Sequence, residues 1–282
     1  IDIKHKLYSQ IDKVRSPNSI ISSNTSTIPL SILTQEMSDT MKADFCITHF
    51  FNPVRFMRLL EIVETPTMNK DKMSGLRDFC QNELGKGIVN CNDTPGFIGN
   101  RIGVYAMQVA MYEALERGLP VEIADALFGR PLGIPKTGVF GLYDLIGIDL
   151  MKDVLASFKK ELQENDPFMD VVAPHPLVEK LLEKGFNGNK GPGGFYQTTI
   201  VDDDEIVKAM NTSDMSYYDF DKVDLEIARR VEKEGIKALL DDGSEYGRYA
   251  FAVLAKIINY SAFCIPEVSS NVTDIDDALR MG

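Results

Sequence analysis

A histidine and a glutamate twelve residues apart are the two side chains in this sequence best suited to acid–base chemistry. His49 follows an apolar run at 43–48, and Glu61 lies inside a second apolar run at 59–63. If the two runs form neighbouring strands, Glu61 can accept one imidazole N–H, which fixes the tautomer and makes the other nitrogen a better base. A buried carboxylate has little other reason to be in such a run. The alternative is a structural pair, with His49 as a hydrogen-bonded core histidine and Glu61 as a chance polar residue in a strand.

Three further polar side chains could converge with this pair, because each follows a predicted strand or opens a predicted helix: Ser26, Asn52 and Asn100. The whole set contains one base, one residue to orient it and two or three hydrogen-bond donors. No Ser or Cys nucleophile adjoins His49 in sequence, and no second histidine lies near it, so no metal site is predicted. Such a set suits proton transfer to or from an oxygen, beside a cofactor that carries the electron chemistry.

The first 92 residues contain the predicted elements that would position this set. Apolar residues at helical spacing indicate a helix from Ile3 to Val14. Short strands are expected at 19–23, around His49, around Glu61 and at 88–91, with helices at 31–41 and 73–84. This order is typical of the second half of a Rossmann-like dinucleotide-binding sheet, without its first half. The fold class predicted for this part is therefore α/β.

A mostly helical domain is predicted after residue 92. The sequence Asp93-Thr94-Pro95-Gly96 combines a capping residue with a proline, which is typical of a helix start. Residues 97–118 then give a helical pattern that is apolar on nearly every side, as in the centre of a domain or an interface. Further helices are predicted at 121–127, 149–162, 175–183, 224–240 and 249–260. No strand is predicted in this part of the chain.

The helical part contains a weak and incomplete internal repeat. Arg101 opens a long helix that the segment 123–127 follows, and Arg248 opens another that the similar segment 275–279 follows. The second copy stops in mid-repeat, and an unpaired repeat leaves an apolar face uncovered. Both ends of the chain thus predict a piece of a longer protein. The predicted parts are the C-terminal half of a dinucleotide-binding domain at 1–92, a first helical copy at 93–197, and a linker with a truncated second copy at 198–282.

Two stretches of unusual composition, one glycine-rich and one acidic, lie between the repeats. Residues 185–196 read GFNGNKGPGGFY, which indicates either a flexible loop or a backbone held close to another group. The acidic stretch Asp202-Asp203-Asp204-Glu205 is interpreted as a solvated helix start, because its spacing matches no calcium-binding loop.

The composition excludes several classes of protein. The net charge of −12 argues against general nucleic-acid binding. The chain has no secretory signal and no apolar run long enough to span a membrane. Widely spaced cysteines without a C-x-x-C motif predict free thiols in a reducing compartment, which means a cytoplasmic location or an organelle matrix. These cysteines are Cys46, Cys80, Cys91 and Cys264.

Taken together, the motifs resemble those of the L-3-hydroxyacyl-CoA dehydrogenase family, and the resemblance runs over essentially the whole chain. Four ordered motifs carry it: Ser23-Asn24-Thr25-Ser26, the block from His49 to Pro53 with Glu61 following, the segment from Asp93 to Arg101, and Gly193-Gly194-Phe195-Tyr196. The doubled helical unit is similar to the longer, multifunctional members of the family. In these members an enoyl-CoA hydratase domain is often attached.

The resemblance implies a reaction and a role for each candidate residue. The reaction would be the NAD-dependent oxidation of (S)-3-hydroxyacyl-CoA to 3-ketoacyl-CoA in fatty-acid β-oxidation. His49 would be the general base that takes the 3-hydroxyl proton, and Glu61 would orient it. Ser26 and Asn100 would hydrogen-bond the reacting oxygen and the thioester region. The residues expected near NAD or the acyl-CoA substrate are Lys4, Asn24, Ser26, Asn52 and Lys190.

One feature of the family is absent from the sequence. No G-x-G-x-x-G occurs in the 282 residues, so the usual pyrophosphate site is missing. We therefore expect this chain alone to bind NAD poorly and to turn over little, and its parent protein to be active. The alternatives are a non-catalytic structural, acyl-CoA-binding or oligomerisation module on the same fold, and a related dehydrogenase for a small hydroxy acid. The apolar helix at 97–118 is compatible with a homodimer or with pairing of the two helical repeats in one chain.

Overall fold

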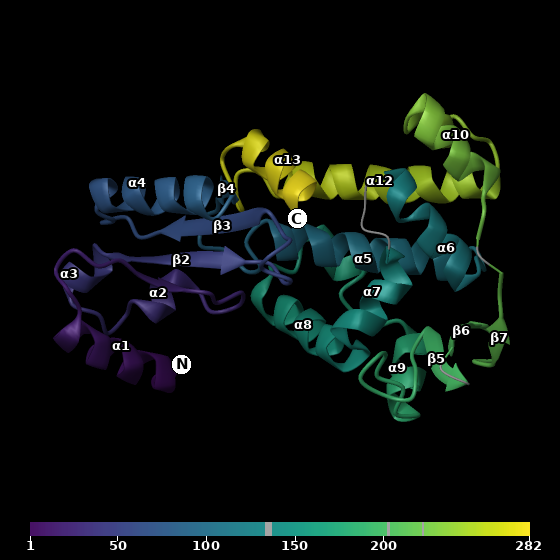
Figure 1. Cartoon of the computed structure of the whole chain (residues 1–282), viewed down its shortest axis with the longest axis horizontal. Coiled ribbons are helices and arrows are strands. Elements are labelled where there is room, and N and C mark those ends of the chain that lie inside the picture. Colours follow the sequence, from purple (N-terminus) through teal and green to yellow (C-terminus); the bar gives the residue numbers. More distant parts are fainter. Residues whose placement is uncertain (133–136, 202–203, 222) are drawn as a thin grey trace. The chain divides into compact units, whose positions relative to one another are not determined.

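A computed structural model describes residues 1–132, 137–201, 204–221 and 223–282 (Figure 1). They form two compact units. The first contains residues 1–103 together with 261–282, and the second contains residues 104–260. The last segment of the chain therefore belongs to the same unit as the first hundred residues. The division into 1–92, 93–197 and 198–282 and the incomplete repeat stay predictions.

A four-stranded sheet forms the centre of the first unit, with the strands in sequence order. The strands are β1 (Ile21–Ser23), β2 (Phe45–Phe50), β3 (Leu59–Glu64) and β4 (Gly87–Asn90). The pairs β1–β2 and β3–β4 are parallel, whereas β2 and β3 are antiparallel. The α/β prediction is therefore confirmed for this part of the chain. The apolar side chains of these strands pack with those of the following helix in one buried cluster, which contains Cys46, Leu60, Ile62, Met68, Met73 and Cys80.

Helices cover this sheet, and one of them differs from its prediction. The helices of the unit are α1 (Asp2–Val14), α2 (Leu30–Leu33), α3 (Asp39–Lys42), α4 (Lys70–Asp78), the π-helical turn Phe79–Glu83 and α13 (Val272–Met281). The single helix expected at 31–41 is wrong: it is two short helices. The second one begins anew because Ser38 accepts the N–H of Met41 and caps it. The helix α1 is present as predicted, with Tyr8 as its buried residue.

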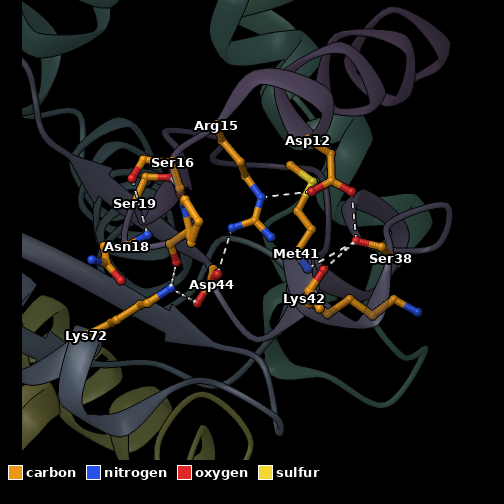
Figure 2. A network of polar contacts seen from close by, with 12 residues as sticks. Asp12, Arg15, Ser16, Asn18, Ser19, Ser38, Met41, Lys42, Asp44 and Lys72 are labelled. Atoms are coloured by element: carbon orange, nitrogen blue, oxygen red, sulfur yellow. Dashed lines mark hydrogen bonds and ion pairs between the residues drawn. The ribbon is translucent and has the colours of Figure 1, made fainter.

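A network of charged side chains holds α1 near the start of β2 (Figure 2). Arg15, just after α1, donates to Asp12 over 2.8 Å and to Asp44 over 2.7 Å. Lys72 on α4 donates to the other oxygen of Asp44 over 2.6 Å. Burial raises the pKa of Asp44, but the hydrogen bonds from Lys72 and Arg15 outweigh burial and hold that pKa below its ordinary value. Asp44 thus joins α1, β2 and α4.

The second unit is rich in helices, most of which the sequence predicts. They are α5 (Gly99–Glu116, of which residues 104–116 lie in this unit), α6 (Val121–Leu127), α7 (Gly138–Ile146), α8 (Ile148–Glu161), α9 (Pro176–Glu183), α10 (Glu226–Glu234), α11 (Lys237–Leu240) and α12 (Glu245–Phe263, up to residue 260). The single helix expected at 224–240 is wrong, because Gly235 has a φ of 81° and separates α10 from α11. The helix α7 was not predicted.

A three-stranded antiparallel sheet also lies in the second unit, against the prediction that this part has no strand. Its strands are β5 (Tyr196–Val201), β6 (Asp204–Met210) and β7 (Tyr217–Asp219). Apolar side chains on it face solvent, for example Ile200, which is 77% exposed, so no alternation marks a buried face. Asp204 and Glu205 open β6, so the predicted helix start is wrong at these two positions; Asp202 and Asp203 lie outside the described residues. Among the described helices, none is long and apolar enough to cross a membrane.

Candidate active site

The predicted contact between His49 and Glu61 is present in the first unit. The two residues lie directly opposite each other in the antiparallel pair β2–β3, so their side chains share one face of the sheet. Nδ1 of His49 lies 2.6 Å from Oε2 of Glu61. His49 is 6% exposed and Glu61 is 0% exposed. At this depth the hydrogen bond is little screened by water, and each group would be costly to bury alone.

The second oxygen of Glu61 is held by backbone groups that the sequence does not reveal. Oε1 accepts the N–H of Ile98 over 3.0 Å and the N–H of Gly99 over 2.6 Å. These N–H groups lie at the start of α5 and have no acceptor within the helix. The helix dipole also favours a negative charge at this end. Because Oε1 is satisfied in this way, Oε2 is the oxygen available to His49. This network assigns the proton to Nδ1 of His49 and leaves a lone pair on Nε2.

Two aromatic rings fix the orientation of the imidazole. Phe51 packs edge-on against His49 with 4.6 Å between ring centroids, and Phe97 lies on it at 5.6 Å. The backbone of Phe97 is in the left-handed region, with a φ of 51°, which brings its ring back toward the sheet. Gly99 is required beside them, since an added Cβ would lie 2.5 Å from Cζ of Phe51. The pair is therefore enclosed by the turn that leads into α5.

The loop after β1 carries Asn24 and Ser26 and is held at both ends. Oδ1 of Asn24 accepts the N–H of Phe50 over 2.8 Å, which ties the start of the loop to the end of β2. Asp93 accepts the N–H groups of Leu30 and Ser31 over 2.6 and 3.0 Å, just beyond the end of the loop. Because Asp93 lies in the segment before α5, it joins this loop to the turn that contains Phe97. Ser26 is half-buried within the loop.

The remaining candidates of the first unit lie in three different elements. Asn52 is exposed in the loop after β2, where Lys86 donates to the carbonyls of Val54 and Met57. Asn100 follows Gly99 in the first turn of α5 and is half-buried. Lys4 is half-buried on α1. The parallel pairing of β1 and β2 brings the ends of these two strands, and so the segments with Asn24, Ser26 and Asn52, to one edge of the sheet.

Lys190 lies in the second unit, in the glycine-rich stretch 185–196. The structure supports the view that the backbone of this stretch is held close to another group, and that group is Asp144 on α7. The carboxylate of Asp144 accepts the N–H groups of Phe195 and Tyr196 over 3.0 and 2.7 Å. A Cβ added to Gly194 would lie 1.9 Å from Oδ1 of Asp144. The glycine is needed for this approach of backbone to carboxylate.

A second buried carboxylate, Asp125, supports the same region, and neither Asp125 nor Asp144 was identified as a candidate from the sequence. Asp125 on α6 accepts the N–H groups of Phe140 and Gly141 at the start of α7, and the hydroxyl of Tyr196. Burial raises the pKa of Asp125 to about 7 and that of Asp144 to about 6, although these donors oppose the rise. Acidic residues inside apolar helical runs were the signal that could have identified them. Both bind backbone N–H groups, which is a structural role.

The donor set at the edge of the sheet suits part of a dinucleotide. The amides of Asn24 and Asn52 and the hydroxyl of Ser26 can hydrogen-bond ribose hydroxyls or a carboxamide, and they follow the carboxyl ends of parallel strands. The 282 residues contain no G-x-G-x-x-G turn for a pyrophosphate. Within the described parts of the chain, no cluster of His, Cys, Asp and Glu side chains could hold a metal ion.

Comparisons with known proteins match two consecutive stretches of the chain to one family. Residues 1–94 match the model of the 3-hydroxyacyl-CoA dehydrogenase NAD binding domain, and residues 96–198 match that of the 3-hydroxyacyl-CoA dehydrogenase C-terminal domain. The chain is 38% identical over its whole length to a putative fatty acid oxidation complex trifunctional enzyme from Rickettsia felis. It is 31% identical to a probable 3-hydroxyacyl-CoA dehydrogenase from Bacillus subtilis, again over the whole chain.

These two relatives are much longer than the chain, which spans 38% of the first and 36% of the second. A solved structure also has the same fold along the whole chain. It is the 3-hydroxybutyryl-CoA dehydrogenase of Escherichia coli, with a TM-score of 0.70 and 21% identity, and the match covers 69% of that protein.

Proposed function

The chain belongs to the 3-hydroxyacyl-CoA dehydrogenase family, and on this premise we propose that its protein oxidises (S)-3-hydroxyacyl-CoA to 3-ketoacyl-CoA in fatty-acid β-oxidation. Bound NAD would supply the acceptor for the hydride that leaves C3. The buried His49–Glu61 pair is the observation that carries the proposal, because Oε2 of Glu61 binds Nδ1 of His49 while two backbone N–H groups hold Oε1 in place.

His49 acts as the general base. Its Nε2 accepts the proton of the 3-hydroxyl group while the C3–H bond breaks, so the oxygen becomes a carbonyl and the imidazole becomes an imidazolium. Glu61 keeps its hydrogen bond to Nδ1 through this step and stabilises the new positive charge. Because the pair is buried, the interaction between the two charges is stronger than it would be in water.

The neighbouring polar residues bind and orient the reactants. Ser26 and Asn100 hydrogen-bond the reacting oxygen and the thioester region. Asp93 supports their action on one substrate, because it joins the loop that carries Ser26 to the segment before α5, which carries Asn100. The residues assigned to the cofactor or to nearby substrate groups are Lys4, Asn24, Ser26, Asn52 and Lys190. Asn24 and Asn52 follow the ends of β1 and β2, which is the edge where open α/β sheets bind ligands.

The context of the enzyme is part of the same proposal. The Rickettsia relative is named a trifunctional enzyme, which supports fusion of the protein to an enoyl-CoA hydratase. Cys46, Cys80 and Cys91 are buried free thiols, which is consistent with a reducing, cytoplasmic compartment. The helical part is proposed to pair either with a second copy or within one chain. Poor NAD binding by residues 1–282 alone stays a prediction.

The test is NADH oxidation with acetoacetyl-CoA by the intact protein. His49→Gln should lower kcat by about a thousandfold, and Glu61→Gln by about a hundredfold, because base and orienter are removed in turn. His5→Gln is the matched control, since His5 is a histidine on α1 that binds the carbonyl of Ile32, and its kcat should stay at the wild-type value. Wild-type turnover by His49→Gln would exclude the proposed mechanism.

A further inference from the structure

A segment from the end of the chain is bound beside the candidate active site. Asn92, just before α5, donates its backbone N–H to the carbonyl of Val268 over 2.8 Å. Its side-chain amide donates to the carbonyls of Pro266 and Glu267, each over 2.9 Å. Asn92 also precedes Asp93, which holds the loop that carries Ser26. Residues 266–268 are therefore joined to the segment that shapes the site.

The side chain of Glu267 reaches α5 itself. Arg101 is in the first turn of this helix, two residues after Gly99, and is 0% exposed. Its two terminal nitrogens lie 3.5 and 3.4 Å from the two oxygens of Glu267, which is a fork-on-fork arrangement. Burying a guanidinium is costly unless acidic or carbonyl partners compensate it, and Glu267 is one such partner of Arg101.

The helix α13 extends this contact along the edge of the sheet. Asp274 accepts the N–H of Asn90 on β4 over 3.2 Å. Met281 lies so close to Gly87 at the other end of β4 that a Cβ added there would be 1.9 Å from its sulfur. β4 in turn pairs with β3, where Val89 lies opposite Glu61. The last segment thus supports both the strand of Glu61 and the helix start that binds it.

We propose that Glu267 is a positioning residue for the His49–Glu61 pair, acting through Arg101 and the first turn of α5. The proposal rests on the proposed function and deepens it. Glu267 fixes Arg101, Arg101 fixes the helix start, and the N–H groups of Ile98 and Gly99 there hold Oε1 of Glu61. When this helix start shifts, Glu61 turns away from Nδ1 of His49, and the base loses its orientation. Asn100, which is assigned to the substrate, lies in the same first turn, so kcat should fall and KM should rise.

The experiment compares Glu267→Gln with Asp276→Asn in the intact protein. Both variants remove one negative charge from the same segment, but Asp276 is an exposed residue of α13. Glu267→Gln should lower kcat about tenfold, since displacement of a catalytic group by about 1 Å has effects of this order or larger. Asp276→Asn should keep the wild-type kcat. Asn92→Ala, which removes two hydrogen bonds to residues 266 and 267, should lower kcat in the same way.

Proton NMR gives a readout that needs no turnover. The proton on Nδ1 of His49 is shared over 2.6 Å and should resonate at low field; it is identified by its loss in His49→Gln. Glu267→Gln and Asn92→Ala should shift or broaden this signal, and Asp276→Asn should leave it in place. If Glu267→Gln and Asn92→Ala both match Asp276→Asn in kcat and in the NMR signal, the positioning role is overturned. An inactive wild-type protein whose signal still responds to Glu267→Gln supports the positioning role and refutes the proposed function instead.

Discussion

Gly99 donates its backbone N–H to Oε1 of Glu61 over 2.6 Å. This bond can form because glycine lets the helix start lie close to the sheet. A Cβ at this position would meet Phe51 at 2.5 Å and Oε1 of Glu61 at 3.4 Å. The carboxylate that holds His49 thus depends on the absence of a side chain at Gly99, the residue that binds it.

Gly99→Ala should therefore lower kcat at least tenfold, because the added methyl group pushes the start of α5 away from Glu61. The matched control is Gly103→Ala, one turn later in the same helix, where a Cβ has nothing within 4 Å. This control should keep full activity and raise the free energy of unfolding by about 1 kcal/mol through helix propensity. Steady-state kinetics and urea unfolding of both variants measure these effects. Equal kcat values for the two variants would show that the close approach at Gly99 is unimportant.

The network around Asp44 should stabilise the first unit in a pH-dependent manner. Its pKa is held below the ordinary value of 3.8, so its contribution is fully present above about pH 4 and is lost as the pH falls through the lower, native pKa. Asp44→Asn should cost about 2–3 kcal/mol at pH 6, because hydrogen bonds from two cations lose their charged acceptor. Urea unfolding as a function of pH should show this deficit shrinking below pH 4. Asp71→Asn, at an exposed position on α4, should cost far less; an equal cost would argue against the network.

The opposite pH dependence is expected in the second unit. The pKa of Asp125 is raised from 3.8 to about 7, so the folded state favours the protonated form, and stability falls as the pH rises from about 4 to about 7. Asp144 contributes in the same direction up to about pH 6. Asp125→Asn should flatten this slope in urea-unfolding measurements. It should also lower stability overall, because an amide cannot accept both N–H groups that Phe140 and Gly141 donate.

Asp153→Asn is the control for this measurement, because Asp153 is exposed on α8. The control should keep the wild-type slope between pH 4 and pH 7. A slope that is the same in wild type, Asp125→Asn and Asp153→Asn would mean that the raised pKa of Asp125 does not govern the stability of this unit.

The sequence predicted the His49–Glu61 contact because His49 follows one apolar run and Glu61 lies inside another, and such runs are easily interpreted as strands. It could not predict what holds the other oxygen of Glu61, since the donors are backbone N–H groups and every residue except proline has one. The roles assigned to Ser26, Asn100 and the cofactor-binding residues stay predictions.

The elements that the sequence analysis missed share a physical cause. The helix α7 contains Gly138 and Gly141, which are poor helix formers, and its start is stabilised by Asp125 from another helix. The strands β5 and β6 expose apolar side chains such as Ile200. Apolar and polar residues therefore do not alternate along these strands. In both cases the local pattern that identifies a helix or a strand is absent from the sequence.

The hairpin of β2 and β3 sets which changes in chain length this site can tolerate. His49 and Glu61 face each other because they are paired in register, and a slip of β3 by one residue would turn Glu61 to the opposite face of the sheet. Beyond Phe51 and Asn52, the connection between the strands can gain or lose residues and still leave that pairing intact. Insertions and deletions should therefore accumulate in the loop in descendants of this sequence, whereas a single deletion within either strand would separate base from carboxylate.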